Sequence, residues 1–151
     1  MTLQELLHTH SKRIINEAVE ALEHSRLSHY KQAGHEHTHH RLMALYVLTT
    51  KAVQERNIGP LLAHVNTIAE ERFKAGFDLS EVQAAFNVLE EALWRHIIND
   101  IPPGNQAEAL GLVGTVLGAG KDALAREYVS LASKTKAPSL NLQSLFAGIE
   151  R

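Results

Sequence analysis

Histidine is the residue type whose number and spacing could support chemistry in this chain. The sequence contains 10 histidines, and four of them fall within one short segment, HEHTHH: His35, His37, His39 and His40. Imidazole nitrogens are good ligands for zinc, nickel and copper. On a helix, His35 and His39 would lie one turn apart, as would Glu36 and His40. The segment is therefore a candidate site for a divalent transition metal.

A solvated helix start is the alternative interpretation of this segment. Histidine runs at helix starts commonly form a polar surface, and a specific metal site needs further ligands that are held in place by neighbouring contacts. Clustered imidazoles could also become charged together as the pH falls toward their usual pKa. We expect no resident cofactor, with a divalent transition metal at the histidine segment as the one candidate.

Other patterns of catalytic or cofactor-binding residues are missing from the sequence. The chain has no cysteine, which excludes disulfides, thiolate metal sites and cysteine nucleophiles. A nucleophile elbow, a phosphate-binding glycine loop and the Glu-x-x-His pairs of di-iron bundles are also missing. His64 and His96 are histidines on predicted helices, and such lone histidines are more typical of packing or surface positions than of haem ligands. We therefore expect a protein without enzymatic activity.

Length and charge restrict the class of protein further. The 151 residues suit one domain, and 44% apolar with 21% charged residues is typical of a globular chain. The formal net charge of −2 gives no basic field that would attract nucleic acid or an anionic membrane. The N-terminal segment carries charges throughout, unlike a signal peptide, and no apolar run reaches membrane-spanning length. We expect a cytoplasmic protein whose partners are neither nucleic acid nor membrane.

Apolar residues recur at spacings of three and four along most of the chain, which predicts amphipathic helices. Two pairs, Thr2 with Glu5 and Asp78 with Glu81, have the spacing of capping boxes at helix starts. The predicted helices cover residues 3–24, 37–56, 60–76, 78 to the turn IPPGNQ, and 105–133. No segment alternates with the period of a strand. The predicted fold is an all-α, single-domain bundle of about five helices over residues 1–136, followed by a tail, 137–151, that could form a short helix.

Two groups of residues within these helices have more than one interpretation. Phe73, Phe77, Phe86 and Trp94 lie on or beside the apolar stripes and are expected in the core rather than on a stacking surface. Gly111, Gly114 and Gly118 share the fifth helix, although each glycine costs about 1 kcal/mol relative to alanine there. Their clustering suggests close approach of another backbone, which belongs either to this chain or to a second copy in a dimer.

The central segment resembles a known family. The run SRLSHYKQAG, followed by GPLLAHVNTIAEERFKAGFDLSEVQAAFNVLEEALWRHI, resembles the helical N-terminal domain of RsbT co-antagonist proteins of the RsbRD type. Similar domains precede bacterial sensor histidine kinases. The resemblance covers residues 26–98, and its strongest part is residues 69–94.

The resemblance implies a bacterial sensory or regulatory input domain, dimeric and without enzymatic activity, in a stress or two-component pathway. A globin-like arrangement of the helices is one option among related regulators. The family domain normally leads into an output module, whereas this chain stops at Arg151. We therefore expect either a stand-alone regulator or an excised domain, which binds a partner protein through residues 138–151 or the glycine-bearing helix. The alternative function is a small-ligand or metal-ion sensor that uses the histidine segment.

Overall fold

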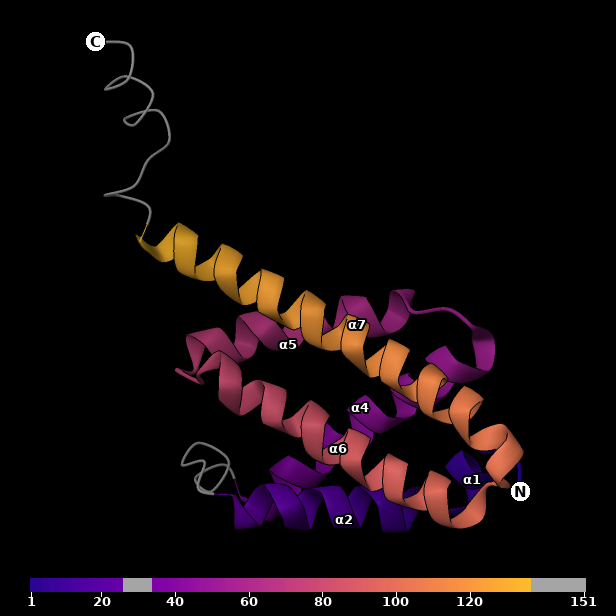
Figure 1. Cartoon of the computed structure of the whole chain (residues 1–151). Coiled ribbons are helices and arrows are strands. Elements are labelled where there is room, and N and C mark those ends of the chain that lie inside the picture. Colours follow the sequence, from indigo (N-terminus) through magenta and orange to yellow (C-terminus); the bar gives the residue numbers. More distant parts are fainter. Residues whose placement is uncertain (26–33, 137–151) are drawn as a thin grey trace.

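The chain folds into a bundle of helices (Figure 1). The computed structural model describes residues 1–25 and 34–136, and within these ranges it contains helices and no strand. The helices are α1 (Leu3–Thr9), α2 (Ser11–His24), α4 (His35–Glu55), α5 (Gly59–Lys74), α6 (Leu79–Asp100) and α7 (Pro103–Lys136). The all-α class and the single compact body that the sequence predicts are confirmed. The predicted tail, 137–151, lies outside the described residues, as do most residues of the connection before α4.

The five longer helices pack as a closed ring. α6 lies between α2 and α7, α7 also packs on α5, and α4 closes the ring by packing on both α5 and α2 (Figure 1). The apolar stripes of all these helices meet in one core, whose largest fully buried side chains include Phe86, Leu93 and Leu117. α6 is thus the helix that joins the N-terminal part of the bundle to the long C-terminal helix.

Helix boundaries follow local capping chemistry. The predicted capping boxes are present at both Thr2–Glu5 and Asp78–Glu81, where each side chain bonds the other residue's backbone N–H. α5 ends before Gly76, which has a φ of 86°, and the Phe77 N–H donates to the Arg72 carbonyl at 2.9 Å. Only a residue that tolerates positive φ closes a helix in this way, so the stop that the sequence predicts at Gly76 is confirmed.

The first predicted helix, residues 3–24, is in fact two helices. The backbone at His10 leaves the helical conformation, with φ −98° and ψ 10°, and this residue both ends α1 and begins α2. The His10 N–H still donates to the Leu6 carbonyl at 2.9 Å, and the His10 carbonyl accepts from the Ile14 N–H at 3.0 Å. The flanking Thr9 and Ser11 are weak helix formers, so a bend here costs little. The apolar stripe continues through both helices, which is why periodicity alone joins them.

The position of α1 is fixed by a buried tyrosine on α4. Tyr46 is 4% exposed, and its hydroxyl donates to the Leu7 carbonyl. This carbonyl lies in the last turn of α1, where the helix itself supplies no further donors. Burial raises the pKa of Tyr46 to about 12 because the charged phenolate would lose its hydration. The neutral hydroxyl therefore ties α1 to α4 through one hydrogen bond.

The aromatic residues are not all in the core. Phe86 is buried, and Phe73 and Phe77 pack partly buried against the core. The prediction for Trp94 is wrong: its side chain is 45% exposed on α6. Trp94 lies two positions from His96, which is buried, so the two residues face opposite sides of the helix.

No helix in the described residues has the length and apolar character needed to cross a membrane.

Candidate functional site

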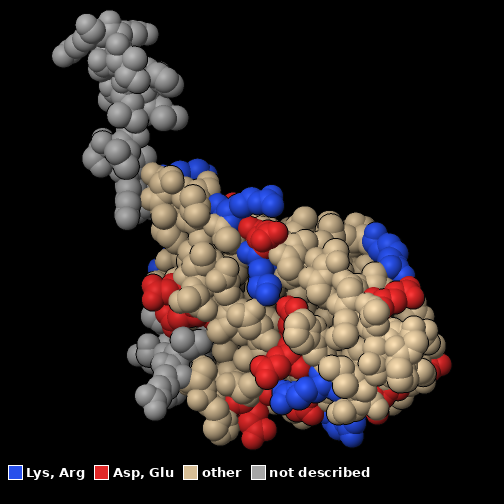
Figure 2. All heavy atoms as spheres, in the orientation of Figure 1, with Lys and Arg blue, Asp and Glu red and all other residues tan. Residues whose placement is uncertain are grey.

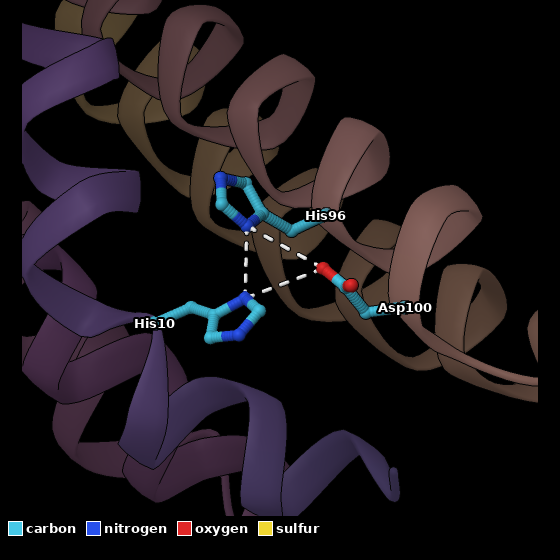
Figure 3. A group of neighbouring side chains, drawn as sticks. All are labelled: His10, His96 and Asp100. Carbon is cyan, nitrogen blue, oxygen red and sulfur yellow. Dashed lines mark hydrogen bonds and ion pairs between the residues drawn. The ribbon is translucent and has the colours of Figure 1, made fainter.

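Two histidines from distant parts of the chain meet between α6 and the junction of α1 with α2. The Nδ1 atoms of His10 and His96 lie 3.0 Å apart, and the rings approach edge to face with centroids 5.1 Å apart (Figure 3). His96 is 6% exposed, and His10 is half-buried. The bend at His10 brings this contact about, because it places the residue at the meeting point of two helices that face α6.

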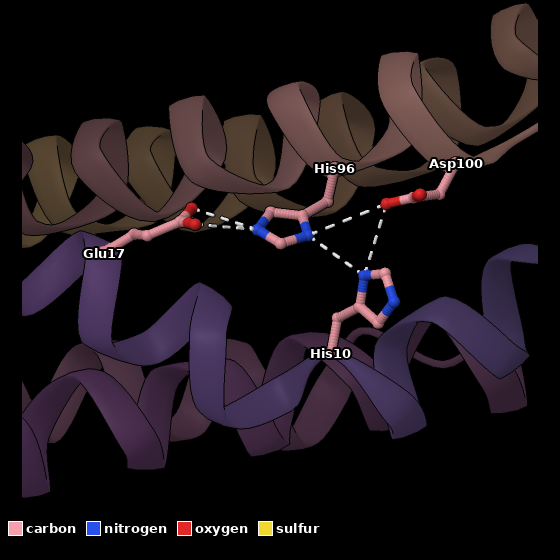
Figure 4. A network of polar contacts seen from close by, with 4 residues as sticks. All are labelled: His10, Glu17, His96 and Asp100. Carbon is pink, nitrogen blue, oxygen red and sulfur yellow. Dashed lines mark hydrogen bonds and ion pairs between the residues drawn. The ribbon is translucent and has the colours of Figure 1, made fainter.

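Two carboxylates complete the cluster. The Asp100 Oδ2 atom lies 3.4 Å from His10 Nδ1 and 4.0 Å from His96 Nδ1, one helical turn beyond His96 on α6. On the other side of the His96 ring, Nε2 lies 3.0 Å and 3.1 Å from the two carboxylate oxygens of Glu17 on α2 (Figure 4). His96 is therefore held between a carboxylate at one nitrogen and the pair of His10 and Asp100 at the other.

The carboxylate of Glu17 determines which nitrogen of His96 carries the proton. A carboxylate only accepts hydrogen bonds, so His96 Nε2–H donates to Glu17. In the neutral ring the other nitrogen, Nδ1, then presents a lone pair toward His10 and Asp100. The His10 Nδ1–H can donate to this lone pair, which accounts for the 3.0 Å contact.

The cluster borders a hollow at the surface. The hollow has a volume of about 500 Å³, and its lining includes both charged carboxylates of the cluster and two arginines: Arg13, Glu17, Arg95, His96, Asn99 and Asp100. The arginines balance the two carboxylates, so the hollow has no strong charge of one sign. Solvent and small solutes can thus reach the edge of a cluster whose central ring is buried.

Within the described residues, the group with converging metal-ligand atoms is His10, His96 and Asp100, whose donor atoms all lie within 4.8 Å of one another. Two imidazole nitrogens and one carboxylate oxygen are a donor set that borderline divalent metals accept. The side chains come from two separate parts of the chain, whose helices pack on each other around the common core.

The histidine segment predicted from the sequence lies elsewhere, in the first turns of α4. His35, His37 and His40 are exposed, and His39 is half-buried. The His35 and His39 rings lie one turn apart with centroids 6.3 Å apart, and His35 Nδ1 contacts the Glu23 carboxylate at 2.5 Å. Metal binding by this segment stays a prediction.

The three glycines predicted at a close helix contact lie on the outer side of α7. A Cβ atom added at Gly111 or Gly118 would meet no atom of the described residues within 4 Å, and one at Gly114 would meet only Glu90 Oε1, at 4.0 Å. The close approach inside the chain is made by Gly120 instead, where an added Cβ would lie 2.9 Å from Phe86 Cε1. Packing within the described chain therefore does not account for Gly111, Gly114 and Gly118.

The sequence contains weak signals for the cluster at His10. His10 occupies a position in an apolar stripe, and Glu17, seven residues later, lies on the same face. His96 and Asp100 are four apart and share a face of α6. Each pair alone is ordinary, and only the packing of α6 on α2 brings the two pairs together.

Comparison with known proteins agrees with the family resemblance of the central segment. Neither a curated protein nor a solved structure shows significant similarity to the chain. The family model of the RsbT co-antagonist protein RsbRD N-terminal domain matches residues 10–134. This range begins at His10 and includes His96, Asp100 and nearly all of α7. The chain therefore belongs to the family of RsbRD-type N-terminal domains of RsbT co-antagonist proteins.

Proposed function

We propose that this chain is a non-enzymatic input domain that acts by binding protein, and that a second copy of the chain docks on the outer face formed by α6 and α7. Membership of the family gives it a regulatory role in stress-response signalling. The observation that carries the docking proposal is the outer position of Gly111, Gly114 and Gly118. These three helix-interior glycines weaken α7 by about 1 kcal/mol each relative to alanine, although an added Cβ atom would make no close contact at any of them within the described chain. An approaching backbone would account for them.

Two large exposed apolar side chains on α6 lie next to the part of α7 that leads to these glycines. α6 and α7 run antiparallel, and Glu90 is near Gly114, so Trp94 and Ile98 on α6 lie level with the start of α7. The Gln106 side chain, in the second turn of α7, donates to the Ile98 carbonyl at 3.1 Å. Trp94 is 45% exposed and Ile98 is 55% exposed. Exposed aromatic and aliphatic side chains beside small residues are typical of a protein interface.

Charges on this face suit a second copy of the same chain. Lys121 Nζ lies 3.2 Å from Asn87 Oδ1 and 3.4 Å from Glu90 Oε2, so a positive group on α7 lies beside a negative group on α6. Acidic and basic side chains lie close together on the face seen in Figure 2, with uncharged surface on both sides. Two copies related by a twofold axis could pair such groups without like-charge repulsion.

The far end of α7 supports a role in contacting another protein. This helix has 34 residues, and in Figure 1 its C-terminal turns extend beyond the other helices. Val129, in this part, is 63% exposed. We place this activity in the bacterial cytoplasm, where the chain would transmit a signal by binding rather than by catalysis.

Solution mass tests the proposal, with two variants matched in chemistry and exposure. We expect light scattering on the untagged full chain to give twice the chain mass of 16.7 kDa. Ile98→Glu, on the proposed face, should give a monomer with unchanged helical circular dichroism, because it buries a charge in the contact. Val47→Glu, at a 56% exposed position on α4, should leave the dimer intact.

Substitution of an outer glycine of α7 tests directly whether a second copy approaches this helix. Gly118→Leu fills the space proposed for the partner's backbone and should give a monomer, whereas Ala63→Leu, at an exposed position on α5 and away from this face, should not. A wild-type chain that stays monomeric at millimolar concentration, or a dimer that tolerates both Ile98→Glu and Gly118→Leu, would contradict the proposal.

A further inference from the structure

We propose that His10, His96 and Asp100 bind one divalent transition-metal ion of the zinc class, which joins the junction of α1 and α2 to α6. The ligand atoms are the two Nδ1 nitrogens and a carboxylate oxygen of Asp100. This site is separate from the proposed docking face, because His96 and Trp94 point to opposite sides of α6. It would give the regulatory domain a chemical input.

The distances between the donor atoms fit an ion at their centre. With zinc–ligand bonds of about 2.0–2.1 Å and tetrahedral angles, ligand atoms lie about 3.3 Å apart. The three separations in the cluster are 3.0, 3.4 and 4.0 Å. Only the contact of Asp100 with His96 must shorten appreciably, and Asp100 is an exposed side chain at the end of α6 that can move. The site therefore needs a change of rotamer and no change of fold.

Glu17 supplies the outer contact that metal-bound histidines commonly have. Its carboxylate accepts from His96 Nε2–H at 3.0 Å, which fixes the ring and leaves the Nδ1 lone pair directed at the proposed ion. Such a carboxylate also makes the ligating nitrogen more basic. The same arrangement serves the metal-free protein, where His10 Nδ1–H donates to His96. An ion replaces that hydrogen bond, and the His10 proton moves to its Nε2 atom.

The surroundings leave one coordination position open. His96 is buried against the core, while Asp100 and the neighbouring Asn99 face the hollow of about 500 Å³. Three protein ligands with a solvent-facing fourth position are the arrangement of an accessible metal site rather than of a closed structural one. Arg13 and Arg95 line the same hollow, so water or a small anion can fill this position.

Titration of the full-length, untagged chain with ZnCl2 after treatment with chelator tests the proposal. Isothermal calorimetry should give one ion per chain, and CoCl2 should give the visible absorption of a site with nitrogen and oxygen ligands. His96→Gln, His10→Gln and Asp100→Asn should each weaken zinc binding by about tenfold or more. Glu17→Ala, which removes only the outer contact, should weaken it by about tenfold to a hundredfold. Circular dichroism checks that each variant folds, and Asp100→Asn is the mildest, because Asp100 is exposed.

Two control chains separate this site from the other candidates. A variant with His35, His37, His39 and His40 all replaced by glutamine should bind zinc as the wild type does. Ile98→Glu should also bind it unchanged, because the ligands belong to one chain, so failure of the dimer and failure of the metal site are distinguishable. Absence of stoichiometric binding in the wild type would overturn the proposal. So would binding that survives His96→Gln and Asp100→Asn but is lost in the fourfold histidine variant.

Discussion

His10 and His96 are separated by 86 positions in the sequence, yet their Nδ1 atoms lie 3.0 Å apart. The contact joins the bend at the start of α2 to the C-terminal turns of α6. It joins the first residue of the segment matched by the family model to α6, the helix that lies between α2 and α7.

This contact predicts that substitutions of the two histidines are not additive. Residues in direct contact show coupling energies of about 0.5–3 kcal/mol. With chelator present, urea denaturation of His10→Gln, His96→Gln and the double variant should give a coupling within this range. The pair His37→Gln and His96→Gln is the control, because His37 is exposed on α4, and its effects should add. Additive effects for His10 and His96 would mean that their contact contributes nothing to stability.

The burial of Tyr46 predicts that the stability of the fold falls at alkaline pH. Tyr46→Phe should lower the free energy of unfolding by about 1 kcal/mol at pH 8, because the Leu7 carbonyl loses its donor. Burial raises the pKa of Tyr46 from 10.0 in its unfolded state to about 12 in the fold. Below pH 10 the phenol is neutral in both states, so its full contribution is present. Between pH 10 and 12 the unfolded phenol ionises first, and the wild type loses about 1.4 kcal/mol per pH unit.

The difference in unfolding free energy between wild type and Tyr46→Phe should therefore shrink and then change sign between pH 10 and 12. Urea denaturation of both proteins at each pH measures it, and the remaining tyrosines cancel from the difference. A gap that stays constant over this range would contradict the raised pKa.

Alanine substitutions at different glycines of α7 should change the stability of the fold in opposite directions. Gly120→Ala should destabilise the fold by about 1–3 kcal/mol, because the new methyl group would lie 2.9 Å from Phe86 Cε1, and the Phe86 ring is 2% exposed and cannot move away. Gly111→Ala and Gly118→Ala should each stabilise the monomer by about 0.5–1 kcal/mol, because their side chains meet nothing and the helix gains rigidity. Denaturation in the Ile98→Glu background separates monomer stability from association. A loss of stability at Gly118 in that background would show that an internal contact requires this glycine.

The burial of Arg72 predicts that its charge can be removed without loss of stability. The residue is 4% exposed, and its Nε atom has no hydrogen-bond partner within the described residues. Its guanidinium lies over the Phe77 ring at 5.6 Å, and Nη1 is 3.6 Å from the exposed Glu71 carboxylate. Arg72→Met keeps most of the volume and removes the desolvated charge, so it should be neutral or stabilising.

Arg72→Ala, the matched control, should cost about 2 kcal/mol or more, because it also removes the packing of the side chain. Thermal denaturation compares the two variants. If Arg72→Met is as damaging as Arg72→Ala, the guanidinium itself stabilises the fold.

Local signals predicted most of the fold. Helix periodicity identified the stripes of α4 to α7, and the capping pairs at Thr2 and Asp78 marked helix starts because they act between residues three apart. Periodicity does not reveal the bend at His10, because the stripe of apolar residues runs through it. The apolar stripe also predicts a buried Trp94, because sequence alone does not say which flank of a stripe is covered by a neighbouring helix.

The candidate site depends on tertiary packing, which local patterns do not reveal. His10 and Glu17 share one helical face, and His96 and Asp100 share another, but the sequence does not say that α2 and α6 are neighbours. The histidines at 35–40 are conspicuous in the sequence because they are dense, whereas the histidines that converge are single residues in otherwise ordinary helices.

The opposite orientation of His96 and Trp94 means that α6 can act as a rigid rod between two surfaces. A helix has a diameter of about 10 Å with its side chains, so these two residues are separated by the thickness of a single element. Helices in a close-packed interior shift as units and do not deform gradually. Any displacement of α6 on the side of His10 therefore moves Trp94 and Ile98 by a similar amount. The two surfaces are coupled through this one helix, without a chain of contacts through the rest of the molecule.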